Sequence, residues 1–210
     1  MRPPEPLSID SIADTLGRYK PFRVPGRRWV AQCGVVVLVA DHDRDGRPMP
    51  PAVLMMQRAQ RTGDPWSGHV SFPGGRVAAS DASTRAAALR ELQEETGFDA
   101  RMGLEPMGRL SDRITREHGR PRPMVISPYV YRTRCAVDLQ PGIEAAALWW
   151  VPLSDLLSPA RRSRITWRVA HVPLQLPCVD LDQARLWGLT LMMVDELLRA
   201  AGLSVALRQG

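Results

Sequence analysis

The segment RELQEETG, residues 90–97, limits how this chain can fold more than any other, because it places three glutamates within five positions. Residues three and four apart lie on the same face of a helix, so Glu91, Glu94 and Glu95 would share one face. Like charges held this close repel each other, most strongly where water is scarce. The fold therefore has to keep this face in solvent or supply a cation to it.

The surrounding sequence predicts a helix over residues 81–96. Asp81 is a suitable N-cap, and Gly97 can end the helix in the left-handed conformation. On the helical wheel, Leu89 and Leu92 fall on the side opposite the glutamates. The helix is therefore expected to bury its leucines and to present its acidic face.

Two features favour a metal site over an ordinary solvated helix face. No lysine or arginine follows Glu91 or Glu94 four residues later, and Gly74 and Gly75 precede the helix. Glycines allow backbone to approach a ligand closely. Carboxylates beside an exposed main-chain carbonyl form an oxygen-rich site for a hard cation, so Mg²⁺ or Mn²⁺ is the predicted cofactor.

Strands and helices alternate along the rest of the chain, which is typical of a layered α/β or α+β domain. Apolar runs predict strands at residues 33–40, 52–58, 69–72, 107–110, 124–132 and 146–151, with a turn at 73–75. Helical spacing of apolar residues predicts helices near residues 9–16, 151–157 and 181–201.

Composition excludes several classes of protein. The longest apolar run, residues 34–40, is too short to span a bilayer, and the N-terminus lacks the pattern of a signal peptide. The three cysteines are widely spaced without a CxxC pair, which suits a reducing cytoplasm. The net charge of +6 is spread along the chain rather than gathered in a stripe, so no nucleic-acid partner is expected. A homodimer is expected only because many α/β domains pair through a two-fold interface.

The segment GGRVAASDASTRAAALRELQEETGF, residues 74–98, resembles the Nudix box, the metal-binding loop–helix–loop of Nudix hydrolases. Asp81 stands where that pattern usually has glutamate, and the spacer before Arg90 is one residue longer than the commonest form. The matching positions are Gly75, Asp81, Arg90, Glu91, Leu92, Glu94, Glu95, Gly97 and Phe98.

The resemblance implies a Nudix-type α/β/α sandwich with a mixed β-sheet over residues 29–205, after an N-terminal extension, 1–28, that carries a short helix. It also implies hydrolysis of a diphosphate in a small-molecule nucleotide. Glu91, Glu94 and Glu95 would bind the metal ions with the Gly75 carbonyl.

The resemblance further implies that Arg90 pairs with one of the glutamates and orients it. One carboxylate must accept a proton from the attacking water. Glu94 or Glu95 is the first candidate, and Glu144 is a second, which could equally be an exposed loop acid.

Further segments resemble the coenzyme A diphosphatase branch of the family, including LMMQRAQRTGDPWSGHVSFPGG, residues 54–75. Arg58 belongs to the part associated with coenzyme A recognition, whereas Asp64 stands where arginine would be expected. The resemblance implies hydrolysis of coenzyme A or its thioesters. Other Nudix substrates, such as ADP-ribose or nucleotide sugars, and a non-catalytic binding or regulatory module are the alternatives.

Arginines are densest between residues 109 and 122, in an expected loop. Arg113, Arg120 and Arg122 are candidates for binding substrate phosphates, and a solvated loop is the alternative. Trp66 could stack on a base or on a pantetheine arm, but burial against the sheet is the expectation.

Overall fold

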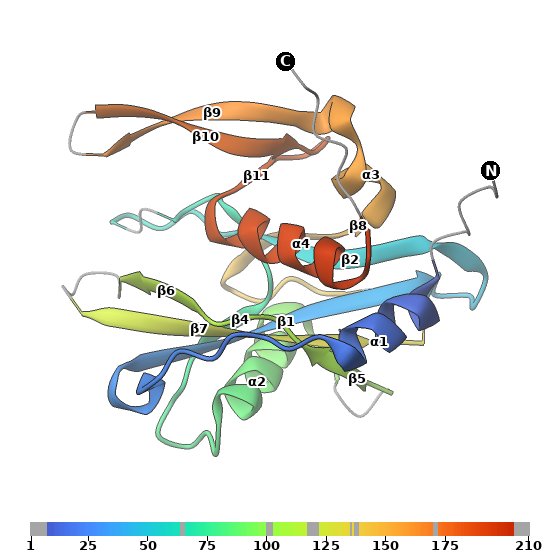
Figure 1. Ribbon diagram of the computed structural model, residues 1–210, viewed down its shortest axis with the longest axis horizontal. Helices are drawn as coiled ribbons and strands as arrows, with labels where there is room; N and C mark the ends of the chain where they lie inside the picture. Colours follow the sequence, from blue (N-terminus) through green and yellow to red (C-terminus); the bar gives the residue numbers. More distant parts are fainter. Residues whose placement is uncertain are drawn as a thin grey trace.

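A mixed sheet of eight strands forms the centre of the fold (Figure 1). The computed structural model describes residues 8–63, 66–99, 103–116, 122–134, 136, 139–169 and 172–203. The strands of this sheet are β1 (Ala31–His42), β2 (Pro48–Arg58), β3 (Val70–Ser71), β4 (Gly74–Arg76), β5 (Glu105–Arg109), β6 (Arg113–Arg116), β7 (Pro123–Arg132) and β8 (Ala145–Pro152).

Strand β1 lies inside the sheet and pairs with three neighbours. It runs parallel to β7 and antiparallel to β2 and β4. The turn expected at residues 73–75 is wrong in part, because Gly74–Arg76 pairs with β1 in the register Gly34 to Gly75. This pairing attaches the glycine-rich segment to the centre of the sheet, beside the acidic helix.

Helices cover both faces of the sheet, which gives the expected α/β/α layers (Figure 1). Alternate residues of β1 point to opposite faces. Val35, Val37 and Val39 pack in one core with α1 and α4, while Val36 and Leu38 pack in a second core against α2. The helices are α1 (Ile9–Arg18), α2 (Thr84–Thr96), α3 (Leu153–Leu157) and α4 (Gly188–Ala200), with short 3-10 turns η1 (Arg27–Trp29) and η3 (Pro159–Arg161).

Helix α2 lies unusually close to β1 because of Gly34. A Cβ atom at this position would lie 1.9 Å from the backbone oxygen of Thr84. The helix begins after Ser83, whose side chain accepts the Ala86 N–H, so the expected Asp81 N-cap is wrong. The expected end is confirmed, since Gly97 has a left-handed conformation with φ of 68°.

A second sheet of three antiparallel strands was not expected from the sequence. It consists of β9 (Arg162–Val169), β10 (Val172–Asp180) and β11 (Arg185–Trp187), in the order β11–β10–β9. The hairpin of β9 and β10 extends away from the eight-stranded sheet (Figure 1). Because β11 precedes α4, the last helix begins at Gly188 rather than at residue 181.

Two buried acids fasten the N-terminal segment to the body. Asp112 accepts the Val24 N–H at 2.9 Å and pairs with Arg27 at 3.0 Å. Glu196, on α4, accepts the Tyr19 hydroxyl at 2.7 Å. In the described part of the chain, no helix is long and apolar enough to cross a membrane.

Replacing Gly34 with alanine is expected to destabilise the protein. The added methyl would force α2 away from β1, and overpacking of this kind costs about 1–3 kcal/mol or more. Gly17→Ala is the matched control, because Gly17 is helical and its Cβ would meet nothing within 4 Å. Urea unfolding of both variants measures the effect, and equal midpoints would contradict the close contact.

Candidate active site

The acidic face of α2 meets the glycine-rich segment at Glu95. The Gly74 N–H donates a hydrogen bond to the Glu95 carboxylate at 2.8 Å. Gly74 has a φ of 154°, and a Cβ atom there would lie 2.4 Å from the Gly34 oxygen. Only glycine therefore fits this position without moving its neighbours, and its N–H holds the glutamate in place.

Gly75 has a similar relation to Glu91. A Cβ atom at Gly75 would lie 2.3 Å from a carboxylate oxygen of Glu91. The side chain of Glu91 therefore lies directly against the backbone of β4. The Gly75 residue predicted as a metal ligand is in this way brought beside a predicted carboxylate ligand.

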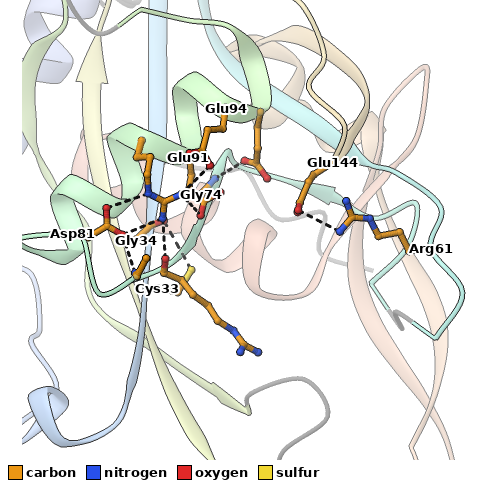
Figure 2. Close-up of polar contacts among 12 residues, drawn as sticks. Cys33, Gly34, Arg61, Gly74, Asp81, Glu91, Glu94 and Glu144 are labelled. Atoms are coloured by element: carbon orange, nitrogen blue, oxygen red, sulfur yellow. Dashed lines mark hydrogen bonds and ion pairs between the residues drawn. The ribbon is translucent and has the colours of Figure 1, made fainter.

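Arg90 connects the acidic groups around the start and middle of α2. Its guanidinium pairs with Glu91 at 2.9 Å and with Glu94 at 2.8 Å. It also binds Asp81 at 3.0 and 3.1 Å and the Arg76 carbonyl at 3.2 Å (Figure 2). The resemblance implied one glutamate partner for Arg90, and the structure has two, with Asp81 as a third acid.

Burial of Glu95 changes its proton affinity. Glu95 is 2% exposed, and the loss of solvation raises the pKa of its carboxyl group to about 8. The charges of Glu91 and Glu144 raise this pKa further, whereas the Gly74 N–H and Arg58 oppose the rise. Burial also raises the pKa of Glu91. Without a cation, the buried carboxyl of Glu95 therefore keeps its proton at neutral pH.

Glu144 lies beside this cluster although it is distant in sequence (Figure 2). Its carboxylate pairs with Arg61 at 3.2 Å, and its carbonyl accepts the Ala59 N–H at 2.9 Å. The Gly142 N–H donates to the Glu95 carbonyl at 2.9 Å. The loop before β8 is thus joined both to the end of β2 and to α2, which brings the second candidate for the proton acceptor to the acidic face.

The carboxylate oxygens of this cluster are the kind of ligand that a divalent cation prefers, but the side chains are not arranged around one point. Among the described residues, no three carboxylate, imidazole or thiol side chains converge to hold a metal ion. The Arg90 guanidinium pairs with both Glu91 and Glu94, so it already supplies positive charge to two of these carboxylates. The buried Glu95, with its raised pKa and its hydrogen bond from the Gly74 N–H, is the group whose burial a hard cation would offset.

The predicted substrate-binding arginines are divided between different parts of the molecule. Arg58 is near enough to Glu95 to lower its pKa, so it lies beside the acidic face. Arg113 is instead paired with the buried Glu196 of α4. Arg122 is exposed just before β7, and Arg120 lies outside the described residues, as does Asp64.

Aromatic side chains that the sequence did not connect form a cluster near this site. Trp66 is 41% exposed, so its expected burial against the sheet is wrong. Its ring contacts His69, which in turn contacts Trp167 of β9 and Trp187 of β11. The contacts of His69 with Trp167 and Trp187 depend on the second sheet, so no local sequence pattern could have revealed them.

Comparison with known proteins identifies the family. Residues 32–170, more than half of the chain, match the family model of the NUDIX domain. The chain belongs to the Nudix family. Nudix hydrolase NudL of Citrobacter koseri is 36% identical over 113 residues, which cover 53% of this chain and 55% of that protein. A protein of Schizosaccharomyces pombe is also 36% identical, over 118 residues that cover 55% of this chain and 36% of that protein.

The chain thus spans about half of one of these curated relatives and about a third of the other. Two solved structures are similar at a lower level. A C. elegans Ap4A hydrolase is 18% identical with a TM-score of 0.48, covering 61% of this chain and 84% of that one. The NUDIX domain of Shewanella oneidensis NrtR, solved with ADP ribose, is 25% identical with a TM-score of 0.46, covering 69% and 85%.

We expect Glu95 to make stability depend on pH when no metal is present. Its folded-state pKa of about 8 exceeds the ordinary 4.5, so the folded state keeps a proton that the unfolded state has lost. The stability from this group is present below pH 4.5 and is lost as pH rises towards 8. Melting curves in EDTA should show a smaller fall over this range for Glu95→Gln than for the unaltered protein.

At pH 8, Mn²⁺ at a hundred times its dissociation constant should raise the free energy of unfolding of the unaltered protein by about 2.7 kcal/mol. Its melting temperature should rise by roughly 5–10 °C. Glu95→Gln should gain much less, while the control Glu105→Gln, on β5, should gain as much as the unaltered protein. Equal gains for all three proteins would contradict a metal site that includes Glu95.

Proposed function

We propose that this protein is a metal-dependent Nudix hydrolase that cleaves the diphosphate linkage of a nucleoside diphosphate derivative. The observation that carries the proposal is the buried carboxylate of Glu95, held by the Gly74 N–H beside Glu91. A folded protein buries an ionisable group with a shifted pKa at a cost in stability, and functional sites are where that cost is common. The family match supports hydrolysis as the function served.

The residues present have distinct roles in the proposed reaction. Glu91, Glu94 and Glu95 would hold Mg²⁺ or Mn²⁺, which supplies charge neutralisation of the diphosphate and lowers the pKa of a bound water. Arg90 holds Glu91 and Glu94 from one side, so it orients them. Glu94 or Glu95 would take the proton from the attacking water.

Glu144 is the alternative proton acceptor. Its charge acts on both Glu91 and Glu95, which supports a position beside the reacting groups. Its carboxylate is engaged by Arg61 at 3.2 Å, so it would have to leave this partner before accepting a proton. Glu94 is engaged by Arg90 in the same way at 2.8 Å, so this contact does not decide between Glu94 and Glu144.

Coenzyme A or an acyl-coenzyme A is the proposed substrate, with 4'-phosphopantetheine and 3',5'-ADP as products. The support is the sequence resemblance around residues 54–75 and the position of Arg58, whose guanidinium lies near Glu95. A guanidinium beside the metal-binding face suits a phosphate oxygen.

A cytoplasmic location, a homodimer and the division at residue 28 stay predictions from the sequence.

A substrate panel tests the assignment. Coenzyme A, acetyl-coenzyme A, ADP-ribose, a nucleotide sugar and Ap4A are incubated with Mg²⁺ or Mn²⁺, and products are identified by mass spectrometry. Cleavage of coenzyme A to the two named products is expected. Cleavage of ADP-ribose or the nucleotide sugar alone would replace the coenzyme A assignment, and no cleavage of any compound would favour a binding or regulatory module.

Removing one carboxylate from α2 should reduce turnover strongly. Proton transfer by a positioned side chain contributes about 10²–10⁴-fold to rate, so Glu94→Gln or Glu95→Gln should lose activity on this scale. Glu105→Gln, which changes an acid on β5 that pairs with Arg132, is the matched control. If kcat of all three variants equals that of the unaltered protein within experimental error, the proposed roles are contradicted.

A further inference from the structure

Four aromatic side chains from three separate segments meet beside the loop that joins β2 to β3. The His69 ring lies 5.6 Å from Trp66, 4.8 Å from Trp187 and 5.9 Å from Trp167, measured between ring centroids. Trp167 and Trp187 are themselves 4.6 Å apart. We call these four residues the aromatic cluster.

The aromatic cluster is not part of the core. None of its members is buried, and Trp66 is 41% exposed. Large aromatic rings bury much apolar area when they stabilise a fold, so a group of them that is only partly buried, with one ring exposed, needs a reason. Partly exposed tryptophan is common where a protein binds a planar ligand.

The segment that carries Trp66 is held firmly by hydrogen bonds. The Ser67 hydroxyl donates to the Arg61 carbonyl and accepts the Arg61 N–H, both at 2.9 Å. The Gly68 N–H donates to the Arg58 carbonyl at 3.1 Å. The residues that follow Trp66, Ser67 and Gly68, are therefore hydrogen-bonded to the end of β2 and to Arg61.

The same hydrogen bonds connect the aromatic cluster to the acidic site. Arg61 binds Ser67 through its backbone and pairs with Glu144 through its guanidinium. The His69 carbonyl accepts the N–H of Arg58, whose charge reaches Glu95. A short set of contacts thus leads from Trp66 to two of the carboxylates proposed to act on the diphosphate.

We propose that the aromatic cluster is the binding surface for the base of the substrate, with Trp66 stacking on the purine. This inference rests on the proposed function, since it assigns to the same site the place of the nucleoside. A purine is planar and stacks on tryptophan without needing specific hydrogen bonds. Trp66 is the binding residue for the base in this scheme, and the other three rings support it.

The β9–β10 hairpin completes the proposed surface. Trp167 faces Leu174 across the two strands, and Leu174 is 42% exposed and Val172 58% exposed. Trp167 is also the member that joins the hairpin to His69. The apolar side of the hairpin therefore continues from the aromatic cluster, where it can cover the outer edge of the base.

Calorimetry in Mg²⁺ compares the binding of ADP with that of inorganic pyrophosphate, and so separates the contribution of the nucleoside to affinity from that of the diphosphate. Stacking on one aromatic side chain changes affinity by about tenfold, so Trp66→Ala should weaken ADP binding on that scale and leave pyrophosphate binding unchanged. Trp66→Phe should retain most of the ADP affinity. Trp29→Ala is the matched control, because Trp29 is 75% exposed and outside the aromatic cluster.

Two results would overturn the inference: ADP affinity that Trp66→Ala leaves intact, or equal weakening of ADP and pyrophosphate, which indicates a structural role. Saturation-transfer NMR on the unaltered protein gives a second measurement if Trp66→Ala does not fold. Saturation reaching the adenine protons supports the inference, and its absence overturns it. Base-dependent ADP binding without hydrolysis of any compound would overturn the proposed function while this inference stands.

Discussion

The contact between α2 and the sheet sets the geometry on which the rest of the molecule depends. Gly34 allows the first turn of the helix to lie against β1, and Gly142 allows the last turn to lie against the loop before β8. A Cβ atom would approach backbone oxygens to 1.9 Å at Gly34 and 2.1 Å at Gly142. Both ends of the acidic helix therefore pack closely against glycines, Gly34 and Gly142, and its glutamates have fixed positions relative to β4.

Electrostatics explains why so close a fit matters. Glu95 has lost most of its contact with water, and a single N–H from Gly74 offsets only part of that loss. Arg90 balances the more exposed Glu91 and Glu94 but also contacts Asp81. The group that holds its proton most strongly is thus at the buried end of the cluster, next to the glycine-rich strand.

Local patterns in the sequence predicted the parts of the fold that are themselves local. The buried strands β1 and β7 and the helix α2 follow directly from apolar runs and helical spacing. The β9–β10 hairpin was missed because Pro173 and Pro177 interrupt what otherwise reads as a strand. Contacts such as Arg113 with Glu196, or Arg61 with Glu144, join residues about eighty positions apart, so no motif could have assigned those arginines.

The two buried acids that hold the N-terminal segment have a consequence for how the chain could be shortened. Asp112 loses an N–H donor and a guanidinium if residues 8–28 are cut away, and Glu196 loses the Tyr19 hydroxyl. Stranded carboxylates in the interior are costly, because their remaining partners cannot replace water. The first helix and the extended stretch after it thus tie α4 to the residues between β5 and β6, and a protease that cut this stretch would loosen the face opposite the acidic helix.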